Sequence, residues 1–536
     1  MNNVDPLLID TGRGFSVFYK DRYLYNSSDP IKRAVLKATQ TNLQNDTLYF
    51  LSSPLLFYGI SELISSLPTD SHIICFEIST DLHKLSNKNI PKIISNSNSI
   101  SFISSTNIET IFDKILELGI WNFRRVKLMN ITGGYSLYAS EYKKILDRID
   151  NSIQEYWKNR MTLIHMGPLW IKNIFLNLFK FFKESNNLSF YMFPVTNCPI
   201  LVIGAGESLE KSITFIKGKR ESFIILAVDT AISILIENGI NPDFIIAVDA
   251  QIYNFYDFMK VKNSSYPLFF DMTGYPGIPA VMNGTIFPFI SNFADTKLLK
   301  RLDTHNLLPY KIPALGSVGI TAIYIALKLT SSIVFYTGLD FAYKIGKSHA
   351  KGSPRNLSEL AVSSRIQPME QLEIYYTRPL IHNKDGNGNN CISDLVLASY
   401  AALMKDNFQD SNRLFNIGTS GLFSGKKTSK TDSLPLNREC REISLTNNLD
   451  YQNKTENFKE FIKNELILLN NVYEETYQYL AGKSGNKEKL ILMLKEADYI
   501  YIHFPDKSPE PVVDPGFLKR ILVSSGYYIS ILKRYI

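Results

Sequence analysis

The spacing of apolar residues changes along the chain, and each pattern predicts a different kind of structure. Residues 15–19 and 23–25 alternate between apolar and polar around a polar turn, which predicts a β-hairpin. Two apolar strands, at 47–51 and 72–78, then enclose a helical stretch near 60–67. A β-α-β unit of this kind predicts a small α/β domain at the start of the chain.

A long helical segment follows, from about residue 140 to residue 184, and we expect it to link this domain to the next one. Its most apolar part, 163–182, is interrupted by Lys172, Lys180, Pro168 and two asparagines. A membrane-spanning helix needs about 20 nearly uninterrupted apolar residues. The segment therefore predicts an amphipathic core helix and no integral membrane segment.

Apolar runs with the length of buried strands become frequent after residue 198. They occur at 200–203, 223–228, 244–248, 267–270 and 333–336. Helical stretches such as 231–237 and 320–329 separate several of them. Continuous apolar strands that alternate with helices are typical of a mostly parallel sheet covered on both faces. We therefore predict an α/β fold built on a central, Rossmann-like sheet.

A Ser/Thr/Lys-rich stretch, 424–432, is expected to form an exposed loop that closes this domain. Helical spacing returns from residue 453 and is broken at 505–515 before a last helix. These patterns divide the chain into an N-terminal α/β domain, a helical linker, a catalytic domain and a helical C-terminal domain. Their expected ranges are 1–139, 140–197, 198–432 and 433–536.

Composition narrows the functional classes. The net charge is +7 over 536 residues without a long basic run, which favours small anionic ligands and does not indicate nucleic acid. The four cysteines lie far apart and form no C-x-x-C pair, so neither a disulfide framework nor a zinc ribbon is encoded. The first 14 residues lack the pattern of a secretory signal. We therefore expect a cytoplasmic protein.

Two glycine-bearing helix starts are candidates for binding a phosphate. The first holds Gly204, Gly206 and Ser208, and the second holds Gly316, Ser317 and Gly319. Glycine lets the backbone approach a phosphate, and a helix N-terminus presents N–H groups and partial positive charge to it. The first start lacks the third glycine of the dinucleotide fingerprint, and no Walker lysine follows. Close packing of helix on strand is the alternative for both.

Acidic residues follow two of the predicted strands. Asp229 comes after the strand at 223–228, and Asp249 after the strand at 244–248. Ligands of open parallel sheets bind beyond the carboxyl ends of strands, so both side chains are placed to contact one. Asp229 can equally cap the helix that follows it. Asp249 is therefore the better candidate for ligand binding.

The strand at 333–336 leads into a second group of polar residues. Asp340 and Tyr343 follow the strand, and Lys347, His349 and Lys351 lie in the next loop. Histidine exchanges a proton near neutral pH, and cations beside it would favour a departing phosphate. The loop therefore fits the activation of an acceptor hydroxyl, with His349 as the general base and the lysines depressing its pKa.

The stretch at 382–390 mimics a calcium-binding loop, with acid or amide side chains at alternate positions. Asn390 stands where such a loop needs glycine, and Val396 where it needs glutamate. A hairpin turn rich in Asn and Gly is the better interpretation. No Asp-x-Asp pair or His/Asp/Glu cluster with metal spacing occurs, so a metal-dependent mechanism is not expected.

Five of these motifs occur in an order and spacing that resemble the motility-associated factor (Maf) flagellin glycosyltransferases. The resemblance covers about residues 198–425, and the opening hairpin and β-α-β unit look like that family's N-terminal domain. The motifs are Gly204-Ala-Gly-Glu-Ser-Leu209, Gly239-Ile-Asn-Pro-Asp243 through Asp249, Leu315-Gly-Ser-Val-Gly319, Gly338-Leu-Asp340 and Lys347-Ser-His-Ala-Lys-Gly352.

The resemblance implies a central domain similar to bacterial CMP-sialic-acid transferases. The donor would be a CMP-activated nonulosonic acid of the pseudaminic or legionaminic type, with no further cofactor, and the acceptor would be Ser or Thr hydroxyls of flagellin. The protein would then be needed for flagellar assembly and motility. By the same resemblance both glycine-bearing helix starts would hold the nucleotide, and Asp340, Tyr343 and His349 would lie near the chemistry.

Two departures from the family pattern stand out. Glu207 occupies a position where the family often has proline, and the stretch 415–421 lacks the family's acidic residue, which leaves Asn416 as a polar contact. The fold also resembles archaeal pterin diphosphokinases, which transfer pyrophosphate with Mg²⁺ on the phosphates. A non-catalytic assembly factor that binds flagellin through its helical ends is a third reading.

Overall fold

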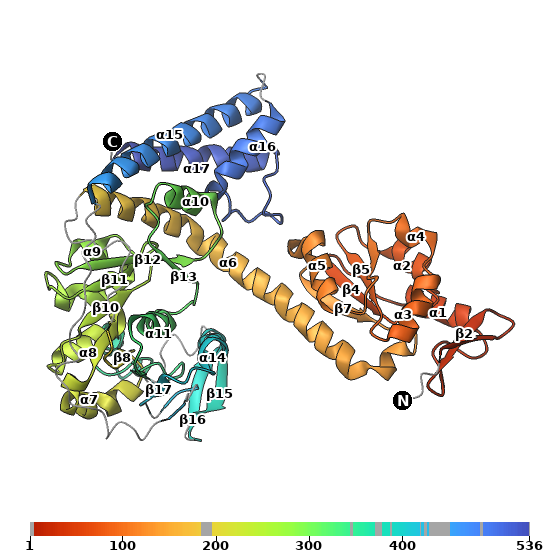
Figure 1. Cartoon of the computed structure of the whole chain (residues 1–536), viewed down its shortest axis with the longest axis horizontal. Coiled ribbons are helices and arrows are strands. Elements are labelled where there is room, and N and C mark those ends of the chain that lie inside the picture. The colour runs from red at the N-terminus through yellow and green to blue at the C-terminus, as the bar shows by residue number, and fades with distance from the viewer. Residues whose placement is uncertain are drawn as a thin grey trace. The chain divides into compact units, whose positions relative to one another are not determined.

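The chain folds into two compact units, shown in the computed structural model of Figure 1. The first contains Met1–His165 and Ile502–Pro511, and the second contains Met166–Tyr501 and Val512–Ile536. The structure describes residues 5–183, 196–343, 347–369, 378–385, 388–418, 420–422, 426–427, 451–482 and 486–534. The four-part division expected from the sequence stays a prediction.

The first unit confirms the predicted hairpin and β-α-β unit. Strand β2 (Phe15–Tyr19) pairs antiparallel with β3 (Arg22–Tyr23), and the turn residues Lys20 and Asp21 have positive φ angles of 49° and 57°. A further strand, β1 (Leu7–Asp10), pairs antiparallel with the other edge of β2. The main sheet is fully parallel, in the order β6-β5-β4-β7. Its strands are β4 (Thr47–Ser52), β5 (His72–Phe76), β6 (Ile100–Phe102) and β7 (Arg125–Met129).

Helices and short helical turns surround this sheet. The α-helices are α1 (Pro30–Thr39), α2 (Ile60–Ser66), α3 (Thr80–Lys88), α4 (Lys92–Ser95) and α5 (Glu109–Leu118). The 3₁₀ turns are η1 (Ile120–Asn122) and η2 (Gly134–Leu137). Apolar side chains of α2, such as Leu63, are fully buried, which is the reason for its helical spacing.

Helix α6 (Ala139–Lys183) is the predicted long helix, and the boundary between the two units falls within it. The two asparagines that interrupt its apolar stretch have a structural role. The Asn173 amide donates to the carbonyls of Ala250 and Thr273, and the Asn177 amide donates to the carbonyls of Met272 and Gly274. They fasten α6 to loops at the edge of the sheet in the second unit. None of the described helices combines the length and hydropathy of a membrane span.

The second unit is built on one large parallel sheet, as predicted. Its strand order is β13-β12-β11-β10-β9-β8-β14-β17-β18, and every pairing is parallel. The strands are β8 (Ile200–Ile203), β9 (Ile224–Val228), β10 (Phe244–Ala247), β11 (Leu268–Asp271), β12 (Ile286–Asn292), β13 (Tyr310–Pro313), β14 (Val334–Thr337), β17 (Leu414–Asn416) and β18 (Lys426–Lys427).

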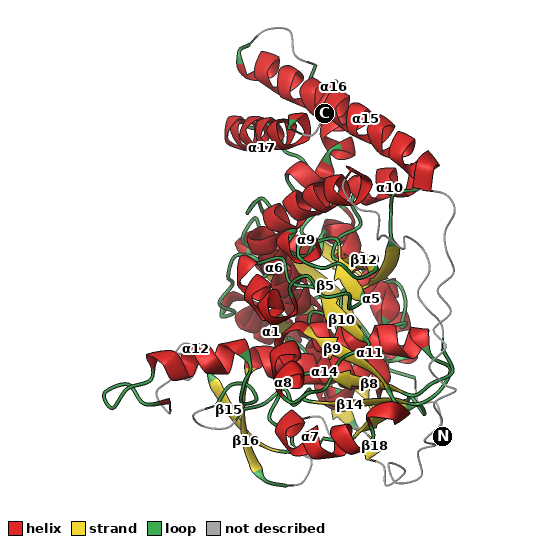
Figure 2. Ribbon diagram, turned by 90° about the vertical axis from the view of Figure 1, so that its left-hand side faces the viewer, coloured by secondary structure: helices red, strands yellow, loops and turns green. Residues whose placement is uncertain are grey.

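Helices flank this sheet, and an antiparallel hairpin lies beside it (Figure 2). The helical segments are η3 (Arg220–Ser222), η4 (Asp229–Ala231), η5 (Ile252–Val261), α7 (Ser208–Gly218), α8 (Ile232–Glu237), α9 (Gly277–Ala280), α10 (Lys297–Thr304), α11 (Val318–Leu329), α12 (Pro354–Val362) and α14 (Leu395–Phe408). The hairpin consists of β15 (Leu380–Lys384) and β16 (Asn390–Asp394), which confirms the predicted hairpin, and residues 386–387 of its turn lie outside the described residues.

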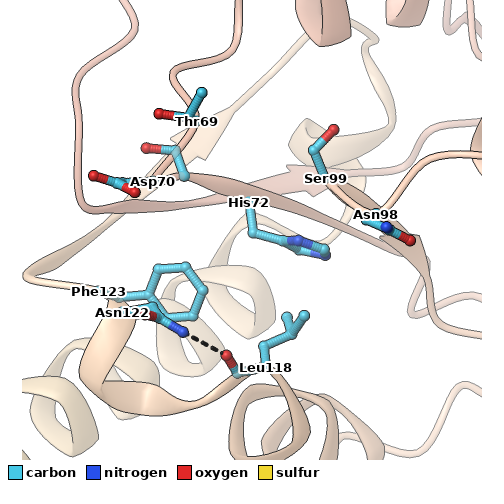
Figure 3. A pocket seen from close by; sticks show the side chains of 9 residues that line it. Thr69, Asp70, His72, Asn98, Ser99, Leu118, Asn122 and Phe123 are labelled. Atoms are coloured by element: carbon cyan, nitrogen blue, oxygen red, sulfur yellow. Dashed lines mark hydrogen bonds between the residues drawn. The ribbon is translucent and has the colours of Figure 1, made fainter. Parts of the chain in front are cut away.

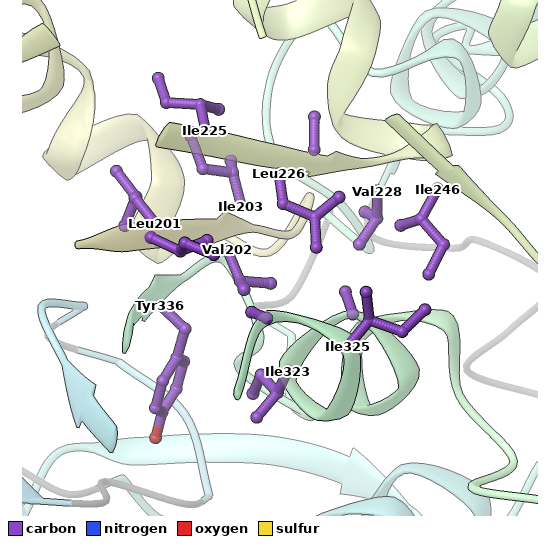
Figure 4. Packing of buried hydrophobic residues seen from close by; sticks show 14 of the residues in the cluster. Leu201, Val202, Ile203, Ile225, Leu226, Val228, Ile246, Ile323, Ile325 and Tyr336 are labelled. Atoms are coloured by element: carbon purple, nitrogen blue, oxygen red, sulfur yellow. The ribbon is translucent and has the colours of Figure 1, made fainter. Parts of the chain in front are cut away.

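The core of the second unit lies between the central strands and α11. Figure 4 shows Ile323 and Ile325 of α11 packed on one side of the strands, opposite residues such as Val202, Leu226 and Ile246. All five side chains are fully buried. The continuous apolar runs of β8, β9 and β10 therefore have the explanation that the sequence suggested, burial on both faces.

Three helices form the C-terminal part, α15 (Tyr451–Leu480), α16 (Lys487–Glu496) and α17 (Pro515–Lys533), with a 3₁₀ turn η9 (Asp498–Ile500). Buried Glu465 of α15 accepts two hydrogen bonds from Arg301 of α10, at 2.8 and 2.9 Å, and one from the Tyr499 hydroxyl at 2.7 Å. A bidentate Arg–carboxylate pair fixes orientation as well as distance, so it sets how α15 packs on α10.

One expectation about the connections is wrong in part. The stretch 424–432 was expected to be a loop, but Lys426–Lys427 form the edge strand β18 beside β17. A two-residue strand leaves no alternating pattern to detect. The rest of that stretch, and residues 185–195 of the predicted boundary, lie outside the described residues.

Candidate functional site

The carboxyl ends of the parallel strands define one polar edge of the second unit. The chain runs from β8 outward to β13 and then returns to place β14 on the other side of β8. This reversal of strand order between β8 and β14 is the position where open α/β sheets bind ligands. The sequence-predicted site residues follow strands of this sheet or lie at helix starts. They fall in four places: the loops around Asp340, the start of α11, the ends of β9 and β10, and the segment that holds Tyr343, Lys347 and His349.

The first group is a closely packed set of loops that we call the Asp340 turn, made of 204–208, 338–340 and 416–418. The Asp340 carboxylate accepts hydrogen bonds from the backbone N–H of Ser208 at 2.8 Å and from its hydroxyl at 2.5 Å. The same hydroxyl accepts from the Gly338 N–H. In the third loop, Asn416 is buried and its side-chain oxygen accepts from the Gly418 N–H at 2.7 Å. Burial raises the pKa of Asp340 to about 6, against these hydrogen bonds.

The glycines of the Asp340 turn are required by close backbone contacts. A Cβ on Gly204 would lie 2.4 Å from the Gly338 carbonyl oxygen, and one on Gly206 would lie 2.6 Å from the Asp340 carboxylate. Gly319, in the first turn of α11, is also tightly packed, since a Cβ there would meet the Leu339 side chain at 2.3 Å. The packing alternative raised for these glycines therefore has a clear structural basis, and their nucleotide-binding role stays a prediction.

The start of α7 is already occupied by the protein itself. Asp340 accepts the Ser208 N–H, while the N–H groups of Leu209 and Glu210 bond to carbonyls of the preceding turn. The Gly206 N–H bonds to the Gly338 carbonyl. A carboxylate thus takes the place at this helix N-terminus that the sequence assigned to a phosphate. These N–H groups are therefore bonded within the protein, and nucleotide binding at this helix start stays a prediction.

The start of α11 differs. Gly316 is exposed and has φ +69°, a left-handed conformation that favours glycine, and Ser317 is the half-buried N-cap residue. The Ser317 side chain makes no capping hydrogen bond. Among the described residues, no side chain occupies this helix start as Asp340 occupies the other. Its hydroxyl and first-turn N–H groups are therefore the better donors for an anionic ligand.

Another group lies at the carboxyl ends of β9 and β10, and we call it the acidic edge: Asp229, Asp249, Asn254 and Asp257. The Asn254 amide donates to Asp249 at 2.8 Å and to Asp229 at 3.3 Å. Asp229 also accepts the N–H of Thr230, but neither η4 nor α8 has a side-chain cap, so the structure does not bear out the capping alternative for Asp229. Burial and then the Asp249 charge raise the pKa of Asp229 to about 7.

Sequence reasoning missed Asn254 and Asp257. They lie on η5, a 3₁₀ helix in which every third residue shares a face, and neither strand nor α-helix spacing detects that period. Asp257 is 6% exposed. Burial, followed by the charges of Asp229 and Asp249, raises its pKa to about 8.

The loop that follows the Asp340 turn holds the predicted base and its cations. The Lys347 ammonium pairs with Glu210 of α7 at 2.7 Å, and the Lys351 N–H bonds to the same carboxylate. Burial lowers the pKa of His349, with the Glu359 charge opposing and the Arg355 charge adding to the effect. The lowered pKa was expected, but Arg355 replaces the two lysines as its charged cause.

A chain of hydrogen bonds orients the His349 ring. The Ser348 hydroxyl donates to Glu359 at 2.8 Å and lies 3.0 Å from Nδ1 of His349. Because its one hydrogen goes to Glu359, the hydroxyl accepts from Nδ1–H, which assigns this tautomer to the neutral ring. Glu359 is buried and is held in turn by Arg355 at 2.9 Å. Nε2 is then the nitrogen able to accept a proton.

Tyr343 lies beside the Asp340 turn, and its hydroxyl is already bound. It donates to Asp394 at 2.7 Å, and Arg378 also contacts that carboxylate at 3.0 Å. Tyr343 and Asp340 line a pocket of about 110 Å³, and Tyr343 also lines one of about 850 Å³ against the β15–β16 hairpin. The tyrosine thus lines two cavities beside the predicted chemistry.

A known protein shares this fold. The chain has the fold of a glycosyltransferase of known structure. That structure, the MAf glycosyltransferase from Magnetospirillum magneticum AMB-1, matches 100% of this chain and 87% of its own, with a TM-score of 0.60 and 13% sequence identity. The predicted α/β fold with a parallel sheet and helical C-terminal region is confirmed.

Two further comparisons concern the sequence. A family model described as 6-hydroxymethylpterin diphosphokinase MptE-like matches residues 172–346, which include both helix starts and the acidic edge. An uncharacterized protein from Treponema pallidum (strain Nichols) is 23% identical over 556 residues, covering 99% of this chain and 96% of that protein. Another from the same organism is 30% identical over 129 residues, which is 22% of this chain and 59% of that protein.

The described residues contain no group of three or more His, Cys, Asp or Glu side chains that could hold a metal ion.

The first unit has a separate pocket of about 410 Å³ near the amino end of β5, shown in Figure 3. It is lined by His72, whose pKa is lowered to about 4 by burial, and by polar residues such as Asp70 and Asn98. Because ligands of parallel sheets bind at the carboxyl ends of strands, this pocket is not the candidate site.

Proposed function

We propose that the protein transfers a sugar from a nucleotide donor, with the site at the carboxyl edge of the second unit. The observation that supports this most is the likeness in fold to a glycosyltransferase over the whole described length of the chain. The polar groups at the reversal of strand order agree with it, because this is where such sheets bind nucleotides.

The finer proposal follows the order of the sequence motifs. The donor is a CMP-activated nonulosonic acid of the pseudaminic or legionaminic type, held by a sialyltransferase-like central domain. The acceptors are Ser or Thr hydroxyls of flagellin in the cytoplasm, which links the protein to flagellar assembly and motility. No further cofactor and no obligatory metal ion take part.

In this proposal the start of α11 binds the nucleotide phosphate through Ser317 and the first-turn N–H groups. Nε2 of His349 takes the proton of the acceptor hydroxyl. The acceptor oxygen then bonds to the anomeric carbon while that carbon's bond to the phosphate oxygen breaks, and CMP leaves with the electron pair. Asp340 positions the loop that leads to His349, and Tyr343 is the alternative base.

The reaction is tested directly with purified protein, flagellin and a CMP-activated nonulosonic acid. Intact-mass measurement of flagellin should show the added sugar, and the added mass should be unchanged by EDTA. If flagellin gains no mass and this protein binds ATP with Mg²⁺ but not CMP, pyrophosphoryl transfer would replace this proposal. That is the activity of the diphosphokinase named in the matching family model. Flagellin binding without any nucleotide binding would leave a non-catalytic assembly role.

A further inference from the structure

Helix η5 divides its side chains among three faces. In a 3₁₀ helix residues three apart are aligned, and Phe258 and Val261 form the buried apolar face. A second face carries Tyr253, Tyr256 and Met259, whose side chains are exposed. The third face holds Asn254 and Asp257, which belong to the acidic edge. The period of three thus brings an amide and a carboxyl to the ends of β9 and β10.

Asp257 has no hydrogen bond or ion pair with any residue that the structure describes, although it is 94% buried. Its neighbours are the carboxyls of Asp229 and Asp249, whose charges act on it. A buried polar group normally has a partner, so an unpartnered one facing a site indicates a ligand. Because burial and those charges hold its pKa near 8, Asp257 is mostly protonated at neutral pH and offers an O–H donor.

Asp249 supplies the complementary acceptor. Its side chain is exposed to solvent, and Asn254 bonds only one of its two carboxylate oxygens. A donor and an acceptor beside one another suit a hydroxyl group, which donates and accepts at once. A phosphate would be repelled by the Asp249 charge, and the described residues form no group able to hold a metal ion.

Tyr400 connects the acidic edge to the start of α11. A Cβ on Gly316 would lie 3.2 Å from the Tyr400 ring, and the charge of Asp249 contributes, after burial, to raising the pKa of that tyrosine. The two sites are therefore neighbours. One offers donors to an anion, and the other offers paired groups to an uncharged, hydroxylated part of the same ligand.

We infer that the acidic edge binds vicinal hydroxyl groups of the donor, with Asp249 accepting and Asp257 donating hydrogen bonds. This rests on the proposed function and deepens it by separating a hydroxyl subsite from the phosphate subsite. The hydroxyls come from the ribose of the nucleotide or from the sugar that is transferred. Both sources share the same chemistry and are separated by the choice of ligand.

The test is titration calorimetry on the full chain with CMP, with 2′,3′-dideoxy-CMP and with CMP-pseudaminic acid. The variants are Asp249→Ala and Asp257→Leu, the latter keeping the buried volume without the O–H. Asp410→Ala, at an exposed position of the same unit, is the matched control. Circular dichroism melting of each variant checks that it is folded.

If the ribose supplies the hydroxyls, wild type and Asp410→Ala should bind CMP about tenfold more tightly than the dideoxy ligand, and both site variants should lose this preference. If the sugar supplies them, the variants should weaken only CMP-pseudaminic acid. If the wild type binds the ligands and both variants bind all three with unchanged affinity, the inference would be overturned and the proposed function would stand. No binding of any ligand to the wild type would overturn both.

Discussion

The carboxyl edge of the second unit has two halves, one around the start of α7 and one around the start of α11. Their glycine-rich sequences are similar, but one helix start is occupied by a side chain and the other is not. Around α7 the glycines pack against the backbone of the Asp340 turn, and a carboxylate occupies the helix start. Around α11 Gly316 is exposed, Ser317 makes no cap, and the acidic edge lies beside them. The same glycine-rich pattern therefore produces a closed half that holds the loops together and an open half whose helix start no described side chain occupies.

The largest expected effect tests the loop that follows the closed half. His349→Ala should lower the transfer rate by about 10²–10⁴-fold, since the acceptor hydroxyl would lose its general base, while CMP affinity stays nearly unchanged. Single-turnover rates with flagellin measure this. His382→Ala, on the β15 strand, is the control and should have little effect on the rate.

The hydrogen bonds from Ser348 to Glu359 and His349 predict a smaller effect on the transfer rate for a second variant in the same loop. Ser348→Ala should lower the rate less than His349→Ala, because it frees the ring tautomer without removing the ring. Its pH–rate profile should shift, whereas a merely structural loss would lower the rate at every pH alike. A His349→Ala protein with a near wild-type rate would move the base to Tyr343.

The closed half is expected to lose stability when its glycines gain a side chain. Gly206→Ala places a Cβ 2.6 Å from the Asp340 carboxylate and 2.8 Å from the Gly338 carbonyl, which should lower the free energy of unfolding by about 3 kcal/mol. A Cβ in Gly316→Ala meets the Tyr400 ring at 3.2 Å and Leu403 at 3.9 Å, both side chains, and its main cost is the left-handed φ, about 1 kcal/mol. Denaturant unfolding of both variants measures the difference, and equal losses would contradict the contrast between the halves.

Much of this architecture could be predicted from the sequence, and the gaps have physical causes. Strands β8, β9 and β10 are continuous apolar runs because both their faces are buried. Strand β12 is interrupted by Pro288, which pairs with Phe270 inside the sheet, so its pattern was not recognised. An apolar run predicts a buried strand, because burial acts on neighbouring residues of the chain. The same local pattern cannot predict which distant loop contacts a helix start, as Asp340 contacts the start of α7.

The site residues illustrate the same limit. Gly204 and Gly316 look alike in the sequence, because only the distant Asp340 distinguishes the helix starts they precede. Asp229 and Asp249 could be placed at strand ends, since that follows from local order along the chain. Asp257 could not, because its importance comes from burial beside two other carboxyls and from the period of a 3₁₀ helix.

The open half should respond to pH through Asp257. Its pKa in the folded protein, about 8, lies above the value of about 3.9 for an unfolded aspartate. Between these values the folded state binds more protons, so the free energy of unfolding should fall as pH rises and the loss should be complete above pH 8. The asparagine of Asp257→Asn does not titrate. The free energy of unfolding of this variant, relative to that of the wild type, should therefore rise by roughly 1 kcal/mol per pH unit between pH 6 and pH 8. Melting curves of both proteins across that range measure the gap, and a constant gap would mean that Asp257 is ionised throughout.

The smallest expected effect separates the two helix starts as ligand sites. Ser317→Ala removes a hydroxyl that caps nothing, so the free energy of unfolding should change by less than about 0.5 kcal/mol. CMP affinity should nevertheless fall about fivefold, the loss of one hydrogen bond to a phosphate. Ser208→Ala should do the reverse, because its hydroxyl bonds Asp340 and Gly338: stability falls by about 1–3 kcal/mol while CMP affinity in the folded protein is kept. Thermal unfolding and calorimetry on the two variants give both quantities. If Ser208→Ala weakened CMP binding and Ser317→Ala did not, the phosphate would bind at α7 after all, and Asp340 would have to leave that helix start when the nucleotide arrives.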